Sequence, residues 1–381
     1  MDFGLTEIQE ITRKTVRDFA EQEVIPQSRA FDESQEFPHA WAKKMGELGL
    51  FGVFVPEKYG GAGLDTVCYA ITIEELSRGD ASAGVIAAVC NGLVCEPLLR
   101  YGNEEQKRRF LEPVARGEWM GAYALTEPGS GSDAAAMRTT ATLERDEWVL
   151  RGTKTFATNG SVAKIVVVYA RTGAKKHEIS AFVVPTDATG FSVLKKEDKM
   201  GIRASDTVTL GFDGCRIPKE NLLGDLHKGF TIAMETLDGG RIGIAAQALG
   251  IATAAYEASV AYARERKSFG QPIGQHQMVQ WMLADMAVGL EAARMLTWRA
   301  AWLKDARRPF GAEASMAKLF AAETAMKITT DAIQVYGGYG FIKEYPVERH
   351  FRDAKITQIY EGTSQIQKLV IARHLLARTE V

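Results

Sequence analysis

The spacing of apolar residues predicts helices over the first part of the chain, from residue 5 to about residue 117. A first amphipathic stretch, ending near Pro26, has its apolar residues at Ile8, Ile11, Val16 and Phe19. Residues 67–76 and 82–99 are apolar almost throughout, which is typical of helices that are buried on every side. We therefore expect an N-terminal all-α domain at residues 1–118.

The pattern changes at Trp119 to short runs rich in β-branched and aromatic residues, separated by polar turns. The clearest runs are residues 148–150, 165–169, 179–184, 191–194 and 207–210. Short strands at this regular spacing are typical of a compact sandwich or barrel. We expect a central β-domain at residues 119–228.

Helical spacing returns at residue 229 and continues to the end of the chain. Three stretches, 241–267, 277–306 and 312–335, are each long enough for a helix of about 35–45 Å. We expect residues 237–242 to open the first of them. Together with a shorter last helix they predict an antiparallel four-helix bundle at residues 229–381. The predicted fold class is thus mostly α with a central β-domain, in the order α, β, α.

The composition argues against several classes of function and does not point to one. The chain has 381 residues, 46% of them hydrophobic and 25% charged, and a formal net charge of −2, which does not favour binding to nucleic acid or anionic membranes. We expect no membrane span, because no apolar run approaches the ~20 residues that one requires. Six scattered histidines show no metal-ligand spacing, so no metal site is expected.

The cysteines and the first residues bear on location. No C-x-x-C pair occurs, and we expect reduced thiols at Cys68, Cys90, Cys95 and Cys215. The opening residues carry no basic segment followed by an apolar one, unlike a signal peptide. These features favour a cytoplasmic protein, although a mature protein of the mitochondrial matrix would look the same.

The residue that most suggests chemistry is Glu361, which we expect in a break between two helices. It is flanked by Tyr360 and Gly362. A carboxylate beside an aromatic ring can lose its hydration, which raises its pKa toward the value that a general base needs. Acidic residues are also common at helix N-termini, where they only cap the helix, and this alternative stays open on the residues alone.

Two segments around this glutamate resemble the active-site region of the acyl-CoA dehydrogenases. They are IYEGTSQIQ at residues 359–367 and RHFRDAK at residues 349–355. In the short- and medium-chain members of that family this glutamate removes the α-proton of the thioester, so the resemblance implies that Glu361 is the catalytic base. Other members carry the base at the position that matches Gly240. A glycine there together with Glu361 fits the straight-chain short and medium groups and the short/branched group.

Two further segments resemble the family's flavin-lining loops: TEPGSGSD at residues 126–133 and GTKTFATNG at residues 152–160. A Gly/Ser loop by itself is a weak signal. The resemblance implies that six residues contact FAD: Tyr123, Leu125, Thr126, Ser132, Phe156 and Thr158. Ser132 would also lie near the pantetheine or pyrophosphate of CoA. Ala157, where many members have isoleucine, is a minor departure.

A third group resembles the segments with which family members bind the FAD of a neighbouring subunit. Its members are Arg266, Ser268, Gln277, Gln334, Gly337 and Gly338. A guanidinium such as that of Arg266 suits a pyrophosphate, but by itself this charge run would read as a solvated helix end. Thr363 and Gln365 would complete the contacts to adenosine. A shared site, and apolar residues on more than one bundle face at Trp281, Met282, Trp298 and Trp302, imply a homotetramer built as a dimer of dimers.

For the substrate, the resemblance implies contacts from Ser132, Asp238, Arg241, Tyr360 and Gly362. Arg241 could instead form a salt bridge with Asp238, which is the commoner outcome for such a pair. The stretches at residues 239–245 and 283–286 look most like the short-chain, butyryl-CoA branch.

The implied reaction is FAD-dependent dehydrogenation of a short- to medium-chain acyl-CoA to the trans-2-enoyl-CoA. The hydride would go to flavin N5, and the electrons would pass to an electron-transferring flavoprotein. By resemblance, the backbone N–H of Glu361 and a ribityl hydroxyl would hold the thioester oxygen. Two rivals remain: an acyl-CoA oxidase of the same fold, and a flavin-loaded binding protein without activity. The intact Glu361 counts against the second.

Overall fold

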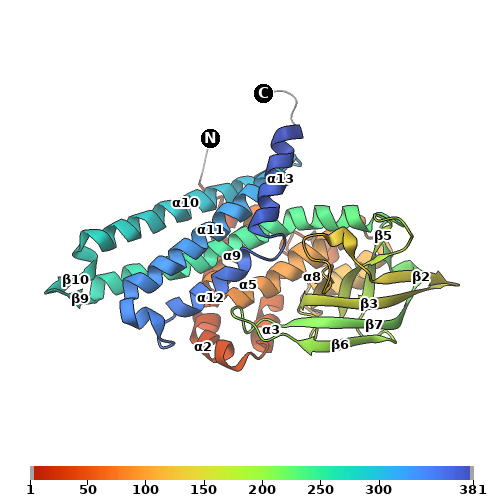
Figure 1. Cartoon of the computed structure of the whole chain (residues 1–381), viewed down its shortest axis with the longest axis horizontal. Helices are drawn as coiled ribbons and strands as arrows, with labels where there is room; N and C mark the ends of the chain where they lie inside the picture. The colour runs from red at the N-terminus through yellow and green to blue at the C-terminus, as the bar shows by residue number, and fades with distance from the viewer. Residues whose placement is uncertain (1–3, 378–381) are drawn as a thin grey trace.

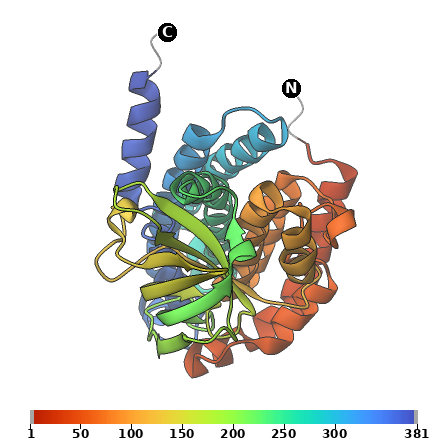
Figure 2. The same ribbon diagram turned by 90° about the vertical axis from the view of Figure 1, so that its right-hand side faces the viewer.

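The computed structural model describes residues 4–377 and has three parts that follow one another along the chain (Figure 1). N-terminal helices pack beside long C-terminal helices, and a β-sheet covers one end of both (Figure 2). The predicted fold class, mostly α with a central β-domain, is confirmed. A single large apolar core runs through both helical parts, and a smaller one lies within the sheet.

The N-terminal helices contain three π-helical turns, each followed two residues later by proline. The turns are Ala20–Val24, Val89–Cys95 and Lys107–Leu111, and the prolines are Pro26, Pro97 and Pro113. A π-helical turn shifts the backbone register, which accommodates a residue that lacks an N–H donor. The first helix therefore does not end near Pro26, as expected, but continues to Ser34. The α-helices here are α1 Glu7–Phe19, α2 Ile25–Ser34, α3 His39–Glu47, α4 Thr66–Gly79, α5 Ala81–Ala88, α6 Glu96–Tyr101, α7 Glu104–Gln106 and α8 Glu112–Ala115.

The continuous helix Ala81–Tyr101 bears on the prediction of no membrane span, which rested on the lack of a long apolar run. Its 21 residues have a mean hydropathy of 1.6 in their most apolar window, so by length and composition this helix is apolar enough to cross a membrane. However, 94% of that window is buried inside the protein, as in the core helix of a soluble protein. Cys90 and Cys95 on this helix, like the other two cysteines, are free and buried.

The sheet has eight strands in the order β6-β7-β3-β2-β4-β5-β8, with β1 parallel to β4. Strands β4 and β5 pair antiparallel in register from Ile165–Pro185 to Arg171–Ile179 and are almost entirely buried. The five predicted runs all lie in strands, whereas β1, β2 and β8 were not predicted. The strands are β1 Gly121–Ala124, β2 Thr140–Glu144, β3 Glu147–Thr158, β4 Ile165–Arg171, β5 Ile179–Pro185, β6 Phe191–Lys196, β7 Thr207–Pro218 and β8 Leu222–Leu223.

The C-terminal part is built around α9 (Gly229–Glu265), which packs against α4, α10, α11 and α12. The helix begins at Gly229, not at residues 237–242 as expected. Gly239 and Gly240 thus lie inside it despite their low helix propensity, and Gly240 packs closely against Glu361 and Leu93. The remaining helices are α10 Gln277–Asp305, α11 Gly311–Tyr336, α12 Val347–Thr357 and α13 Ser364–Ala377.

Short elements connect these parts. A hairpin of β9 (Lys267–Ser268) and β10 (Gln271–Pro272) joins α9 to α10. It lies at the end of the helical layer that is farthest from the β-sheet (Figure 1). The 3-10 turns are Glu57–Tyr59, Ala134–Ala136, Lys219–Asn221, Ile273–Gln275 and Gly337–Phe341.

Candidate active site

Glu361 lies in the break between α12 and α13, in a strained turn. Its φ is +50° and that of Gly362 is +96°, so two successive residues adopt the left-handed region. Two buried side chains hold the turn. Lys318 of α11 donates from Nζ to the Gly362 carbonyl at 2.7 Å. Gln367 of α13 donates from Nε2 to the same oxygen at 2.8 Å and to the Glu361 carbonyl at 3.2 Å.

The Glu361 carboxylate points at α9. A Cβ added to Gly240 would overlap its Oε2 and would lie 3.0 Å from its Cδ and 3.1 Å from Leu93. The residue as a whole is partly exposed, yet Oε2 is buried and has no hydrogen-bond partner among residues 4–377. Burial raises the pKa of Glu361 to about 7, against the opposing effect of the positive charges of Lys318 and Arg241. A carboxyl with this pKa exchanges its proton near neutral pH.

Beside Glu361 a second buried polar atom has no partner in the described part of the chain, the hydroxyl of Tyr69 on α4. A Cβ at Gly243 would overlap this hydroxyl, and one at Gly92 would approach it to 3.1 Å. Glycines at both positions therefore keep the space around it free of side chains. The charge of Glu361 contributes to a Tyr69 pKa well above the usual range, after burial as the main cause.

The predicted substrate residues divide between this region and the sheet. Arg241 is buried on α9, pairs with Asp238 and also donates to Ser315 Oγ at 3.3 Å. Tyr360 donates its hydroxyl to Gln247. The Gly362 carbonyl is held by Lys318 and Gln367. Ser132, by contrast, is exposed on the loop after β1.

The six residues predicted to line the flavin lie on β1, on the end of β3 and on the loop between residues 125 and 139. The buried Lys154 fixes this loop, because its Nζ donates to the Leu125 carbonyl at 3.0 Å and to Glu127 at 2.8 Å. A bulge in β3 follows, and it turns Phe156 outward with φ +58° and 64% of its surface exposed. A large ring held outward by strained backbone fits a site that receives a flat aromatic ligand. Of the other predicted residues, Tyr123 and Leu125 are buried, and Thr126 accepts a hydrogen bond from Thr155 N at 2.9 Å. Thr158 is the last residue of β3.

Four more of the predicted flavin residues gather at the far end of the helical layer, beside the β9–β10 hairpin. Arg266, Ser268, Gly337 and Gly338 line a hollow of about 410 Å³. A Cβ at either glycine would meet nothing within 4 Å. The Arg266 guanidinium lies 5.2 Å from the ring centre of Tyr339. Gln277 and Gln334 are exposed at the adjoining helix ends, whereas Thr363 and Gln365 lie next to Glu361.

The β9–β10 hairpin beside this hollow and the β-sheet lie at opposite ends of the molecule (Figure 1). One chain therefore does not bring both groups of predicted flavin residues to the same cofactor. The arrangement fits a site that two chains complete.

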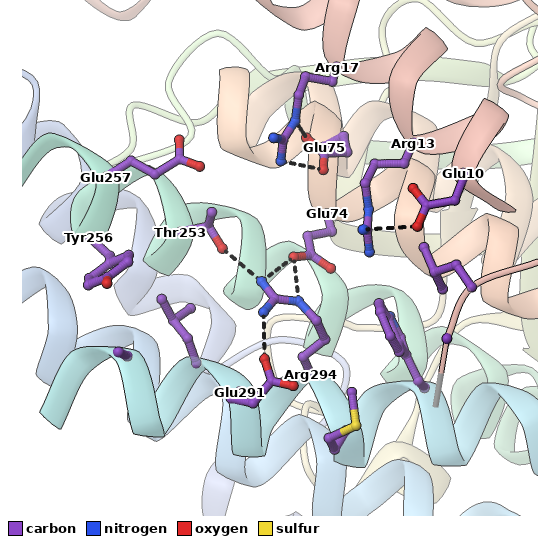
Figure 3. A pocket seen from close by; sticks show the side chains of 16 residues that line it. Glu10, Arg13, Arg17, Glu74, Glu75, Thr253, Tyr256, Glu257, Glu291 and Arg294 are labelled. Atoms are coloured by element: carbon purple, nitrogen blue, oxygen red, sulfur yellow. Dashed lines mark hydrogen bonds and ion pairs between the residues drawn. The ribbon is translucent and has the colours of Figure 1, made fainter. Parts of the chain in front are cut away.

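Another hollow, of about 910 Å³, lies between α1, α4, α9 and α10 (Figure 3). Two ion pairs cross it, Arg294 with Glu74 at 2.8 Å and Arg17 with Glu75 at 2.8 Å. None of the predicted site residues lines it. Glu361 and its neighbours therefore remain the candidate active site.

Family models match nearly the whole chain. The N-terminal, middle and C-terminal domains of acyl-CoA dehydrogenase match residues 6–118, 122–215 and 227–376. A curated relative, the mitochondrial short-chain specific acyl-CoA dehydrogenase of Bos taurus, is 54% identical over 98% of this chain and 91% of its own. The chain belongs to the acyl-CoA dehydrogenase family. Its predicted likeness to the short-chain branch is confirmed.

Solved structures agree with this family. Butyryl-CoA dehydrogenase from Megasphaera elsdenii is 44% identical with a TM-score of 0.97, covering 99% of this chain and 100% of its own. A chain in the structure of the "Electron transferring flavoprotein of Acidaminococcus fermentans" is 48% identical with a TM-score of 0.98 over 99% and 100%. A Bacillus anthracis acyl-CoA dehydrogenase complexed with FAD is 37% identical with a TM-score of 0.93 over 98% and 67%.

An acyl-CoA dehydrogenase of this family is a flavin-dependent oxidoreductase that acts on acyl-CoA, and its cofactor is FAD. The outward Phe156 and the open glycines of the distal hollow fit such a cofactor. Lys318, Tyr69, Leu93 and Gln367 were not predicted as site residues. In the sequence Lys318 is one lysine on an alanine-rich helix, and only the tertiary structure places it beside Glu361.

Proposed function

We propose that this acyl-CoA dehydrogenase oxidises short- to medium-chain acyl-CoA thioesters to trans-2-enoyl-CoA, with Glu361 as the base that takes the α-proton. The observation that carries the proposal is the Glu361 carboxylate, whose buried Oε2 has no hydrogen-bond partner in the described part of the chain and whose pKa is about 7. Such a group is poised to accept a proton from a weak carbon acid at neutral pH. Gly240 faces this carboxylate, and a side chain at that position would overlap Oε2.

The residues around Glu361 have distinct roles in this proposal. The backbone N–H of Glu361 has no acceptor among residues 4–377, so it is free to donate to the thioester oxygen as negative charge develops there. Leu93 and the surrounding helices exclude water from the carboxylate. Arg241, held by Asp238, adds positive charge at the same end of α9.

For the cofactor, we infer that Tyr123, Leu125, Thr126, Phe156 and Thr158 of one chain hold the flavin end of FAD. Ser132 would contact the pyrophosphate or the pantetheine of CoA. FAD, when bound, supplies the acceptor for the hydride that leaves the β-carbon, at flavin N5. Two chemical roles thus fall to two parts of the protein, proton removal to the Glu361 turn and hydride acceptance to the sheet.

We infer further that a second copy of the chain completes the cofactor site through Arg266, Ser268, Gln277, Gln334, Gly337 and Gly338, with Thr363 and Gln365 near adenosine. The opposite placement of the two groups in Figure 1 supports this inference. So does an exposed apolar face of α10 formed by Met278, Trp281 and Val288, exposed by 64%, 62% and 71%. We therefore propose a homotetramer built as a dimer of dimers. Light scattering tests it, because it measures the mass of the assembly in solution. A monomer that still binds FAD tightly would contradict it.

For the electron acceptor we propose an electron-transferring flavoprotein, an inference supported by the likeness to a chain in a structure that contains one. The alternative of the same fold is an oxidase that uses dioxygen. Anaerobic reduction followed by mixing with air separates the two, because an oxidase reoxidises rapidly without a protein acceptor. A cytoplasmic location remains part of the proposal and is supported by bacterial relatives such as the Clostridium acetobutylicum short-chain enzyme.

The decisive experiment is a screen of straight and branched acyl-CoA substrates from about four to sixteen carbons with the yellow, FAD-loaded enzyme. We expect bleaching of the flavin with butyryl-CoA and its near homologues, and formation of the trans-2-enoyl product. A protein that stays colourless after addition of FAD, or that no acyl-CoA bleaches, would overturn the proposal.

A further inference from the structure

Lys318 is a buried charged group that the proposed reaction does not use. It lies on α11 with none of its surface exposed, among the buried alanines Ala314, Ala317 and Ala321. A buried ammonium is costly unless it is hydrogen-bonded or paired. Within residues 4–377, Nζ makes one hydrogen bond, to the Gly362 carbonyl at 2.7 Å, and no salt bridge.

The carbonyl that Lys318 holds belongs to the turn that aims the base. Glu361 is not a glycine, yet its φ is +50°, a conformation that costs free energy in any residue with a side chain. The Gly362 oxygen accepts from Lys318 and, at 2.8 Å, from Gln367. These two donors reach the turn from different helices, α11 and α13, and together they fix the peptide that follows Gly362.

The charged groups around this turn couple Lys318 mainly to Glu361. Lys318 and Arg241 are the cations that act on Glu361, and Arg241 already pairs with Asp238. The charges of Glu361, Arg241 and Glu323 in turn act on the pKa of Lys318. The oxygens of Glu323 accept hydrogen bonds from Ser364 and Gln358, so this acid is held at the turn rather than at the lysine. Glu361 is thus the acid that the Lys318 charge acts on most.

We propose that Lys318 is a positioning residue for the catalytic base: its ammonium clamps the Gly362 carbonyl, keeps Glu361 in its left-handed turn and favours the ionised carboxylate. The inference rests on the proposed function of Glu361 and adds a residue on which that function depends. Lys318 does not touch the reacting atoms in this proposal. It acts through the backbone and through its charge.

The charges of Lys318 and Glu361 act on each other. Burial lowers the pKa of Lys318 and raises that of Glu361, and in each case the charge of the other group opposes the effect of burial. Loss of the Lys318 ammonium should therefore raise the pKa of the Glu361 carboxyl further.

The test is the pH dependence of flavin reduction by butyryl-CoA in Lys318→Met, a change of similar length that removes both charge and donor. We expect the midpoint of the rate profile to move upward by ~1 pH unit, since a nearby opposite charge shifts a carboxyl pKa by about 1–3 units. The rate at pH 7 should fall several-fold and recover as the pH rises. A second readout needs no turnover: infrared difference spectra of the holoenzyme follow the Glu361 carboxyl band, which is identified by its loss in Glu361→Gln.

Three further variants separate the effect of the hydrogen bond to Gly362 from the effect of the positive charge. Lys318→Gln keeps a hydrogen-bond donor but loses the charge, so its midpoint should also move upward. Lys318→Arg keeps the charge and should keep the midpoint. Gln367→Leu removes the other donor to Gly362, so the rate should fall at every pH while the midpoint stays.

An unchanged midpoint in Lys318→Met or Lys318→Gln, or an equal shift in Gln367→Leu, would overturn the inference. Glu361→Gln tells this failure from that of the proposed function. If Glu361→Gln is inactive while the Lys318 variants leave the midpoint unchanged, Glu361 is still the base and only the role of Lys318 is wrong. If Glu361→Gln still reduces flavin at the original rate, the proposed function fails as well.

Discussion

Two buried lysines in this protein each lie beside a glutamate, and the two glutamates behave in opposite ways. At the sheet, Lys154 makes a direct ion pair of 2.8 Å with Glu127, whose oxygens also accept from the backbone N–H groups of Arg138 and Thr139. These donors outweigh burial and lower the pKa of Glu127. At the candidate active site, Lys318 donates to a carbonyl instead of to Glu361, and one carboxylate oxygen has no donor in the described chain.

The comparison teaches what separates a structural carboxylate from a reactive one. Burial raises the proton affinity of both glutamates, and both lysines have a pKa lowered to about 8. The difference lies in how many donors point at the carboxylate oxygens. Glu127 is saturated and stays ionised, whereas Glu361 is left short of donors and binds a proton near pH 7.

The largest contrast is expected in catalysis. Glu361→Gln preserves the size of the side chain but removes the base, and general bases contribute about 10²–10⁴-fold to rates, so flavin reduction by butyryl-CoA should fall at least that much. Glu127→Gln removes the same charge from the saturated pair and should reduce flavin within about tenfold of the parent. Stopped-flow bleaching at saturating substrate measures both. Comparable losses in the two variants would mean that the unsatisfied oxygen is not what matters.

The next contrast is in the free energy of unfolding, where the larger loss is expected at the sheet and the smaller one at the candidate active site. Lys154→Met leaves Glu127 buried without its cation, and breaking a buried pair in this way costs about 3–5 kcal/mol. Lys318→Met removes an ammonium that makes one hydrogen bond within residues 4–377, and it should cost less, because a buried charge is itself expensive. Urea unfolding of the two FAD-loaded variants at pH 7 gives both numbers. A larger loss in Lys318→Met would contradict the comparison.

Replacing the two glutamates with glutamine should change the free energy of unfolding in opposite directions, with a gain at Glu361 and a loss at Glu127. The folded-state pKa of Glu361, about 7, lies above the ordinary value of 4.5, so unfolding releases a proton between these values and stability falls as the pH rises through them. Glu361→Gln should therefore gain about 1–3 kcal/mol at pH 8 and little at pH 5. The pKa of Glu127 is lowered, so its contribution is present above pH 4.5 and lost as the pH falls through the folded-state pKa. Glu127→Gln should lose stability at pH 8.

The smallest expected effect comes from Gly240, the residue that the free oxygen of Glu361 faces. Gly240→Ala adds a Cβ that overlaps Oε2, so the carboxylate must turn aside, and we expect flavin reduction to slow by about tenfold. The matched control is Gly239→Ala, whose Cβ would meet only the flexible end of Lys304 at 3.4 Å. Equal rates in both variants would mean that Gly240 does not set the direction of the carboxylate.

The sequence predicted those elements of the fold whose signal lies in consecutive residues, and it missed those that depend on packing. The long helices and five of the strands were predicted because their periodicity extends over many residues. Strands β1, β2 and β8 have two to five residues, too few to show alternation. The start of α9 was misplaced because Gly239–Gly240 reads as a helix boundary, whereas packing against Glu361 and Leu93 keeps the helix continuous there.

At the site, Glu361 was predicted because its neighbours along the chain form a motif. Lys318 is separated from it by more than forty residues, and Tyr69 by almost three hundred. Nothing in their own surroundings in the sequence distinguishes them from lysines and tyrosines elsewhere in the helices. Their part in the site depends on how α4, α9 and α11 pack together, and that is visible only in three dimensions.

The apolar helix Ala81–Tyr101 has a consequence for how the protein reaches its folded state. In the finished molecule 94% of its most apolar window is covered, but the elements that cover it include α9, which is synthesised more than a hundred residues later. Until then a new chain exposes a segment apolar enough to associate with other chains or with hydrophobic surfaces. Yield in refolding and in cells should therefore depend on protein concentration and on chaperones that bind apolar segments, even though the folded enzyme conceals this helix.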